Sequence, residues 1–305
     1  MVVSSFFSHL WNSSCEDSIS LRCCICGNVA FWFASIINIF VDYLAYNAKA
    51  SLSSSKPNPN TSSNASSSWK SSHYLIQSKL QPMIFLSTKE LFDAIILAGF
   101  NMLIVAPFIC CPLFECLWDL IHGTNRVVET DIWNWRREIL IVWPMNMIIN
   151  EITFYGAHYI MHYLNSGCLS YQIIHKIHHR FTAPNAICAA YAHPIEFIFG
   201  NVLCICIGPI VMNSHPYTSY VWFTLAMLST CKGHCGYNIL NAKTHDLHHE
   251  KFNCNFGVLH FGDYIMDTTY RSQSESNGEE KKKLTVAEIV AQFGQTLKDE
   301  TLLSG

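Results

Sequence analysis

Long apolar runs separated by polar stretches dominate the chain. Residues 28–46, 91–117 and 139–155 each approach or exceed the length of about 20 residues that an α-helix needs to cross the hydrocarbon core of a bilayer. Two further runs, 195–212 and 217–231, are short, and a Gly-Pro pair interrupts the first of them. We expect these two to form a hairpin that spans the bilayer or dips into it. The pattern therefore predicts an all-α fold, a multi-span transmembrane helical bundle.

The polar stretches divide the chain into three parts. Residues 47–83 are rich in Ser, Asn and Pro and hold too few large apolar side chains to form a core of their own. We predict that residues 1–83 comprise a luminal N-terminus, the first span and this linker. Residues 84–270 are predicted to form the membrane-embedded functional domain. Residues 271–305 are predicted to be a charged C-terminal tail with an amphipathic surface helix.

Composition supports a membrane protein. Half of the residues are hydrophobic and 13% are charged, about half the charged share of a soluble domain. The net charge of −3 gives no electrostatic reason to expect a nucleic-acid partner. Many of the 14 cysteines lie inside apolar runs, so we interpret them as small buried hydrophobic residues and not as a disulfide framework.

The linker charges predict an orientation. Its charged side chains are four lysines and no acids: Lys49, Lys56, Lys70 and Lys79. Basic loops stay on the cytoplasmic side of a membrane, so the linker is predicted to be cytoplasmic and the N-terminus luminal. With one crossing for each of the next two spans, the segments that follow also become cytoplasmic. The sequon at Asn12 is then predicted to carry glycan, and those at Asn60 and Asn64 are not.

Histidines concentrate in three short motifs after the third apolar run. One is H-x-x-x-H and two are H-x-x-H-H. The eight residues are His158, His162, His175, His178, His179, His245, His248 and His249. Helix positions i, i+3 and i+4 lie on one face, so each motif is expected to present its imidazoles as one cluster. Eight imidazoles exceed the four ligands of a tetrahedral zinc ion and suit two metal ions. Tyr159 stands where a zinc protease has its glutamate base, which excludes that motif.

Two other classes of protein compete with a metalloenzyme. A membrane transporter for metal ions would carry acids or histidines inside several spans along a pathway. Here the clusters lie outside the spans; Asp42 and Glu151 are the main acids within them, and Asp93 and Glu115 lie near the ends of the second. Because a charge in lipid is costly, Glu151 is expected to face the bundle interior. A binding protein with a dead site is the other alternative, and the intact motifs argue against it.

The motifs resemble the three histidine boxes of the membrane-bound fatty acid hydroxylase and sterol desaturase superfamily. The similarity extends over about residues 133–271 and includes His193-Pro-Ile-Glu196 and Gly233-His234-Cys-Gly-Tyr237. The run from His249 to Phe256 is most similar to the cholesterol 25-hydroxylase group. The chain departs from the family where a Trp-Asp pair is usually followed by Gly-Thr, because it reads Gly262-Asp263 and then Asp267-Thr268. That departure puts the local packing in question.

The resemblance implies a di-iron oxygenase that hydroxylates a lipid, a sterol first of all, with O2 as co-substrate. Oxidation of C4-methyl sterols and desaturation of sterols or fatty acids use the same boxes and stay open. Electrons are expected from NAD(P)H through a separate reductase and a cytochrome b5-like carrier, since the chain has no G-x-G-x-x-G motif of its own. The implied location is the endoplasmic reticulum membrane, with the di-metal site facing the cytoplasm.

The resemblance also assigns roles to single residues. The eight box histidines are the expected metal ligands, and His234 is the expected ninth. His193, Glu196 and Asp246 are expected to support the ligands from outside, Asp246 by accepting an N–H from a neighbouring histidine; Asp263 is a further candidate. Five histidines are expected to have no metal role: His9, His73, His122, His215 and His260.

Overall fold

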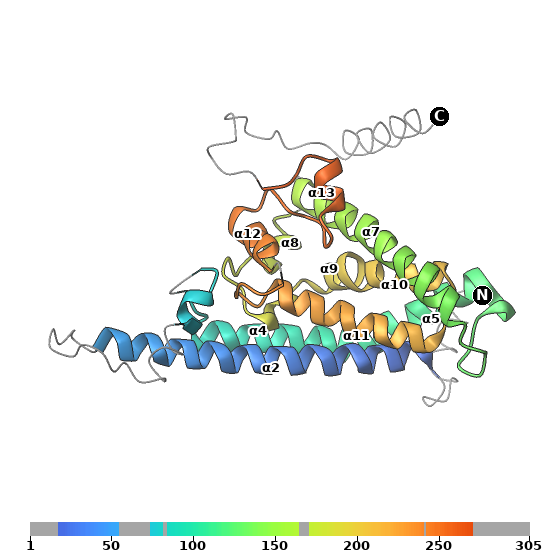
Figure 1. Cartoon of the computed structure of the whole chain (residues 1–305), viewed down its shortest axis with the longest axis horizontal. Coiled ribbons are helices and arrows are strands. Elements are labelled where there is room, and N and C mark those ends of the chain that lie inside the picture. The colour runs from blue at the N-terminus through green and yellow to red at the C-terminus, as the bar shows by residue number, and fades with distance from the viewer. Residues whose placement is uncertain (1–17, 55–73, 82–83, 165–170, 241, 271–305) are drawn as a thin grey trace.

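The computed structural model describes residues 18–54, 74–81, 84–164, 171–240 and 242–270. Within these ranges the chain is helical and forms no strand, which confirms the all-α prediction (Figure 1). The N-terminal half contains α2 (Ile19–Ser54), α4 (Thr88–Phe100), the π-helix η1 (Asn101–Cys110), α5 (Cys111–His122), the 3-10 turn η2 (Gly123–Asn125), α6 (Trp135–Arg137), the π-helix η3 (Glu138–Val142) and α7 (Trp143–Tyr163). The C-terminal half contains α8 (His175–His178), the 3-10 turn η4 (Ala186–Ala190), α9 (Pro194–Glu196), the π-helix η5 (Phe197–Val202), α10 (Leu203–Val211), α11 (Pro216–Gly233), α12 (Lys243–Lys251) and α13 (Phe261–Ile265).

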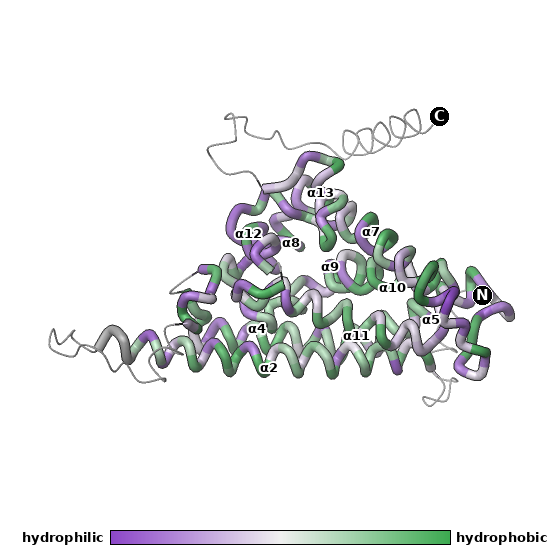
Figure 2. Tube along the Cα trace, viewed as in Figure 1, coloured by the Kyte–Doolittle hydropathy of each residue, from purple (hydrophilic) through white to green (hydrophobic). Residues whose placement is uncertain are grey.

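Several of these elements join into long helices that could span a membrane. Four helices in the described part of the chain have the necessary length and apolar character: Ile19–Ala50, Thr88–Asn125, Trp135–Tyr163 and Pro194–Val211. They cover the first four predicted runs, apart from Met212 at the end of the fourth, and the multi-span prediction is confirmed. The fifth run forms α11, which does not belong to this set. Its Ser, Thr and Tyr side chains lower its hydropathy, and it packs along α2. Figure 2 shows the apolar helices below a more polar region around α8 and α12.

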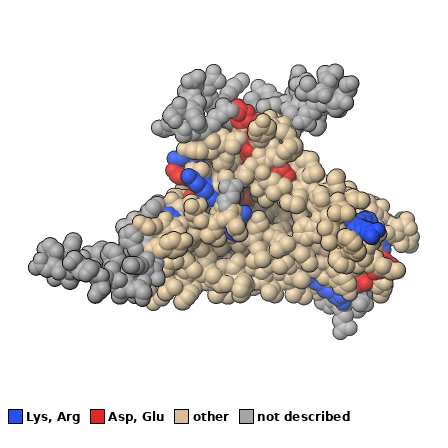
Figure 3. Space-filling view, in the orientation of Figure 1, with Lys and Arg blue, Asp and Glu red and all other residues tan. Residues whose placement is uncertain are grey.

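The helices leave one end of the bundle for the histidines. In Figure 1, α2, α4 and α11 run side by side, and α7 rises away from them toward α8, α12 and α13. The helix formed by η5 and α10 packs against α7. On the face shown in Figure 3, charged side chains gather around the α12 region and near the α5 end, and most of the surface between them is uncharged. The distribution is the one expected of a helical layer that faces lipid.

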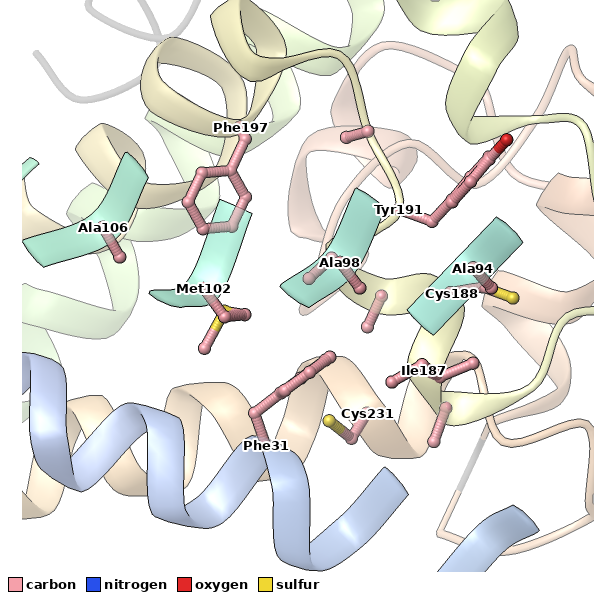
Figure 4. Packing of buried hydrophobic residues seen from close by; sticks show 14 of the residues in the cluster. Phe31, Ala94, Ala98, Met102, Ala106, Ile187, Cys188, Tyr191, Phe197 and Cys231 are labelled. Atoms are coloured by element: carbon pink, nitrogen blue, oxygen red, sulfur yellow. The ribbon is translucent and has the colours of Figure 1, made fainter. Parts of the chain in front are cut away.

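The main core ties the loop after the first H-x-x-H-H box to the membrane helices. Figure 4 shows η4 side chains packed between α4 and α2. Ala94 and Ala98 are fully buried on α4, and their small side chains let Ile187 of η4 approach closely. The amide Nδ2 of Asn101 donates to the carbonyls of Ala190 and Ala192 at 2.9 Å each. This loop therefore has a fixed position on the bundle.

The end of the predicted linker is folded into the protein. Lys79 is only 5% exposed, and its Nζ donates to Asp42 of α2 at 2.9 Å. Asp42 also accepts from Tyr237 and Asn185 at 2.7 Å each. Residues 74–81 were expected to have no core of their own; they are held against the rest of the protein by this ion pair and by two backbone hydrogen bonds, Leu80 N to Gly236 O at 2.9 Å and Asn238 N to Ser78 O at 2.8 Å. Lys79 is also not a free positive charge of the kind that the orientation argument counted.

Other predictions fall partly outside the described residues. All twelve described cysteines are free, and nine of them are buried, which agrees with their interpretation as small apolar residues. His9, His73, the three sequons and the tail 271–305 lie outside the described residues. The three-part division of the chain stays a prediction.

Candidate metal centre

Nine histidines converge where α7, α8, α12 and the end of α11 meet. They form two groups, and within each group one nitrogen of every ring lies within 4.8 Å of the others. Group A consists of His158, His162, His175, His179 and His248. Group B consists of His178, His234, His245 and His249. The structure thus brings together all eight box histidines and the expected ninth, in sets of five and four.

Each H-x-x-H-H box is divided between the two groups, although one cluster per box was expected. Box residues four apart stay together: His175 and His179 in group A, and His245 and His249 in group B. The residue at i+3 joins the opposite group. With 3.6 residues per turn, position i+4 lies about 40° to one side of position i, and position i+3 lies about 60° to the other. Two groups packed on either side of such a helix therefore separate i+3 from i+4.

The nitrogens of group A are too close and too numerous for ordinary hydrogen bonding. His162 Nε2 lies 2.9, 3.0 and 3.2 Å from the Nε2 atoms of His175, His179 and His248. A neutral imidazole carries one proton, so one such nitrogen cannot bond all three neighbours. Two ligands at right angles around one ion, each about 2.1 Å from it, would be about 3.0 Å apart. The donor set fits a metal ion.

Group B shows the same convergence with fewer donors. His234 Nε2 lies 3.3 Å from His178 Nε2 and 3.1 Å from His245 Nε2. His249 Nε2 is buried and has no hydrogen-bond partner. A buried nitrogen without a partner is costly, and a metal ion in the middle of the group would satisfy it.

The outer nitrogens of six rings donate to fixed acceptors, mostly carbonyls of loops beside the helices. The pairs are His158–Phe256 O (2.8 Å), His248–Cys254 O (2.7 Å), His234–Thr230 O (2.8 Å), His178–Tyr191 O (3.2 Å), His249–Phe181 O (3.2 Å) and His175–Glu196 Oε1 (2.8 Å). With Nδ1 protonated, the lone pair of Nε2 points toward the centre of the group. Such bonds orient metal-binding histidines and select their tautomer.

Burial also sets the charge of the rings outside the spans. Loss of hydration lowers the pKa of His175 and of His234 to about 3. Burial lowers the pKa of His178, and it holds the pKa values of the remaining rings outside the spans well below the ordinary histidine value: His179, His245, His248 and His249. The cationic form is disfavoured because burial removes the water that would hydrate its charge. The imidazoles are therefore neutral near pH 7, which is the form that binds a metal ion.

The structure distinguishes the three residues expected to support the ligands. Glu196 is 2% exposed and accepts from His175, as expected. Asp246 accepts from the amide of Gln81 at 3.0 Å, and its partner is thus not a histidine. Gln81 also donates to Thr182 O at 2.6 Å, so it joins the third box to the loop after the second. His193 accepts from the backbone N–H of Ile195 and caps α9, outside both groups.

Two buried carboxylates fix the segment that follows the last box. Glu151 is 1% exposed, as predicted for an interior acid. It accepts from the backbone N–H groups of Val258, Leu259 and Gly262 at 2.8, 2.7 and 3.0 Å. Asp263 accepts from the N–H groups of Phe256 and Gly257 at 2.7 and 2.8 Å. The carbonyl of Phe256 accepts from His158, so the two acids help to position a histidine of group A. In the sequence, the only sign of this role was that Glu151 is an isolated acid in an apolar run.

The departure from the family pattern is resolved within the same segment. A Cβ added to Gly262 would lie 2.5 Å from the ring of Tyr155, so this ring occupies the space that a tryptophan at position 262 would need. Asp267 stands where the family usually has glycine, and it keeps a left-handed conformation with φ of 52°. Aspartate tolerates that region better than most residues. The Tyr155 ring therefore fills the space of the missing tryptophan, and Asp267 adopts the backbone conformation of the missing glycine.

An apolar cavity of about 300 Å³ ends at group B. Its walls come from α7, η4, η5, α10, α11, the start of α12 and residues 257–260. Lining residues include Trp143, Met147, Phe154, Ile205, Trp222, Leu225, His234, His245 and His260. From Trp143 to Phe154 the wall follows α7 over eleven helical steps, about 16 Å along the axis. His260 borders this cavity although it belongs to neither group, a place that its sequence did not indicate.

Comparison with known proteins connects this geometry to a family. A family model described as "Fatty acid hydroxylase" matches residues 143–268, a segment that contains all nine histidines. Fatty acid hydroxylase domain-containing protein 2 of Homo sapiens is 40% identical over 124 residues, which are 40% of this chain and 36% of that protein. Methylsterol monooxygenase erg25B of Aspergillus fumigatus is 32% identical over 186 residues, which are 56% of this chain and 60% of that protein.

A third relative broadens the range of lipids. Sphingolipid C4-hydroxylase sur2 of Schizosaccharomyces pombe is 29% identical over 167 residues, which are 48% of this chain and 57% of that protein. The chain thus spans between 36% and 60% of the length of these three relatives. No solved structure matches it.

Proposed function

We propose that this chain, which carries a fatty acid hydroxylase domain at residues 143–268, is a membrane-bound oxidoreductase that hydroxylates a lipid. One observation carries the proposal: two adjoining groups of convergent histidines lie at the end of the candidate membrane helices, and one of them, group B, borders an apolar cavity between the helices. A metal transporter would need polar groups along its spans, whereas Glu151 and Asp42 are held by internal hydrogen bonds.

The donor sets fit two metal ions, which we propose to be iron, one held by group A and one by group B. Bound iron would supply the reduction of O2 and the oxidation of a C–H bond. The protein's own residues keep the ligands neutral and oriented. Burial lowers the pKa values, and the carbonyl and Glu196 acceptors fix the rings. Nine nitrogen donors and no thiolate or carboxylate in either group make the site rich in imidazole.

The cavity determines which part of a substrate reaches group B. Its walls are mostly apolar, so they would exclude water and bind hydrocarbon along about 16 Å of α7. His234 and His245 border the cavity, so a carbon placed at that end would be the one oxidised. We propose a sterol as substrate, in line with the methylsterol monooxygenase among the relatives. The chemistry could be hydroxylation of a sterol side chain, oxidation of a C4-methyl group or desaturation. These three reactions are distinguished by their products.

The direct test combines metal and lipid analysis. The full chain, purified from expressing cells, is expected to hold close to two irons per chain, and the membranes of those cells should contain an oxygenated sterol. A His248→Ala variant should lack the product. His215→Ala is a matched control, since His215 is also buried but caps α11 far from both groups. One tightly bound zinc ion without iron, and no new lipid, would overturn the proposal.

We further propose that the histidine groups face the cytoplasm in the endoplasmic reticulum membrane and receive electrons from NAD(P)H through a reductase and a cytochrome b5-like carrier. The orientation rests on the linker lysines that remain after Lys79 is removed from the count. Glycan on Asn12 and none on Asn60 is the expected result, read from the gel shift of Asn12→Gln and Asn60→Gln. A shift for Asn60→Gln alone would reverse the orientation and exclude a cytoplasmic donor.

A further inference from the structure

The segment after the last histidine box exposes apolar side chains. In residues 258–264, Val258 is 39% exposed, Leu259 47%, Phe261 56% and Tyr264 80%. The only acid in the segment, Asp263, is fully buried, and the segment has no Lys or Arg. Its outer surface is therefore apolar without a charged side chain. Contiguous exposed apolar surface of this kind marks a contact with protein or lipid.

The segment lies along the C-terminal part of α7, a candidate membrane-spanning helix: residues 258–262 contact the helix at Glu151 and Tyr155, and the end of α13 packs near Tyr163. Its backbone bonds to Glu151 of α7, and Gly262 packs on Tyr155. Glu151 is twelve residues before the end of α7 at Tyr163, about 18 Å along the helix axis. The neighbouring outward residues of α7 are Ile148, 47% exposed, and Ile152, 58% exposed. The start of the 258–264 segment therefore adjoins the exposed apolar face of α7 at Ile148 and Ile152.

This surface is built rigidly. A Cβ on Gly257 would lie 2.4 Å from Glu151 Oε1, so only glycine permits this close approach. His260 adopts φ of 62° and starts α13, which keeps Phe261 and Tyr264 turned outward. Two buried carboxylates and a left-handed residue thus hold a short, exposed apolar surface in one conformation.

The same segment is also a wall of the cavity. Val258 and Leu259 line the cavity, and both side chains are partly exposed. This stretch is therefore part of the cavity wall and carries exposed apolar surface at the same positions.

We propose that residues 258–264 insert into the bilayer hydrocarbon beside α7 and form the lipid-side wall through which the substrate enters the cavity. The lipid contact follows from position, exposure and lack of charge. The role as an entrance rests on the proposed function. The occupant is acyl chain, because the surface adjoins the lipid-facing side of a spanning helix.

Photo-crosslinking tests the lipid contact without reference to activity. The photoreactive residue p-benzoylphenylalanine replaces Tyr264 in the full chain in cell membranes. Ile152 on the outer face of α7 is the positive control, and Glu250 on the polar side of α12 is the negative control. Mass spectrometry should find phospholipid adducts at positions 264 and 152 and none at 250. Adducts at 264 with residues 271–305 of the chain, with a second copy, or with nothing while 152 captures lipid, would each overturn the proposal.

A paired substitution tests the entrance. Phe261→Glu places a charge at the proposed lipid contact, and Phe261→Leu keeps an apolar side chain. The Glu variant should raise the KM for the lipid while kcat holds, and the Leu variant should resemble the parent; equal KM values would remove the entrance role. Lipid adducts at 264 from a chain that shows no turnover would leave the membrane contact standing and refute the proposed function instead.

Discussion

The two H-x-x-H-H boxes have the same spacing and opposite uses. Box 175–179 gives two histidines to group A and one to group B, and box 245–249 gives one to group A and two to group B. The pair at i and i+4 stays together in each box, and the residue at i+3 crosses over. Each box therefore ties the two groups to each other, and neither group can be built from one box alone.

The comparison also shows that the groups are not equivalent. Group A receives the additional pair His158 and His162 from α7 and is buried on all sides. Group B has a single additional donor, His234, and it borders the cavity through His234 and His245. We infer that group B is the side from which a substrate is reached, and that group A is enclosed behind it.

The largest expected effect comes from the crossing histidines. His178→Ala and His248→Ala should each abolish turnover, as should alanine at any other box histidine, because one proposed ligand is lost from a small set. His248→Ala should lower the metal content of group A, and His178→Ala that of group B. Iron per chain by mass spectrometry, with turnover in membranes, is the measurement. If two or more box variants keep parental turnover, the boxes are not the metal site.

The next largest effects on turnover distinguish His234, a proposed ligand, from Glu196, which only hydrogen-bonds a proposed ligand. His234→Ala should also abolish turnover, since it would leave group B with three donors. Glu196→Ala should lower turnover by about 10–100-fold, the usual cost of losing a hydrogen-bond partner of a ligand. Glu196→Gln should recover part of that loss, because its amide oxygen can still accept from His175. Equal turnover of the Ala and Gln variants would show that the hydrogen bond has no role.

A smaller effect is expected on stability at the segment after the third box. Glu151→Ala removes the acceptor of three backbone N–H groups and should lower the free energy of unfolding by about 2–4 kcal/mol. A lower Tm in detergent, relative to the exposed control Ile152→Ala, would show it. An unchanged Tm would mean that the segment does not depend on this carboxylate.

The smallest expected effect is on stability, at Asp267, which stands where the family usually has glycine. Asp267→Gly should keep turnover and raise stability by at most about 1 kcal/mol, because glycine adopts positive φ without steric cost. Gly262→Trp should instead lower Tm, since its side chain would overlap Tyr155. A gain in Tm from Gly262→Trp would contradict the packing described for that ring.

Local patterns in the sequence were sufficient to predict the candidate membrane helices and the histidines that converge. The apolar runs gave the four candidate spans because the length needed to cross a bilayer is a property of each run alone. The spacing within each box identified the eight residues that meet, and the lone acid Glu151 was correctly expected inside. These features depend on residues close together along the chain, where helical geometry relates sequence position to direction.

Only the tertiary structure decided how these pieces are combined. The division of each box, the pairing of Asp246 with Gln81 and the burial of Lys79 on Asp42 all join segments far apart in the sequence. Likewise, α11 packs along α2, although the apolar residues of α11 are not concentrated on one face of the helix. Helix propensity and residue spacing predict that a helix forms and which side chains share a face, but they do not predict which other helix packs against that face. The partners of these residues, and the cavity between the helices, therefore exist only once the bundle has formed.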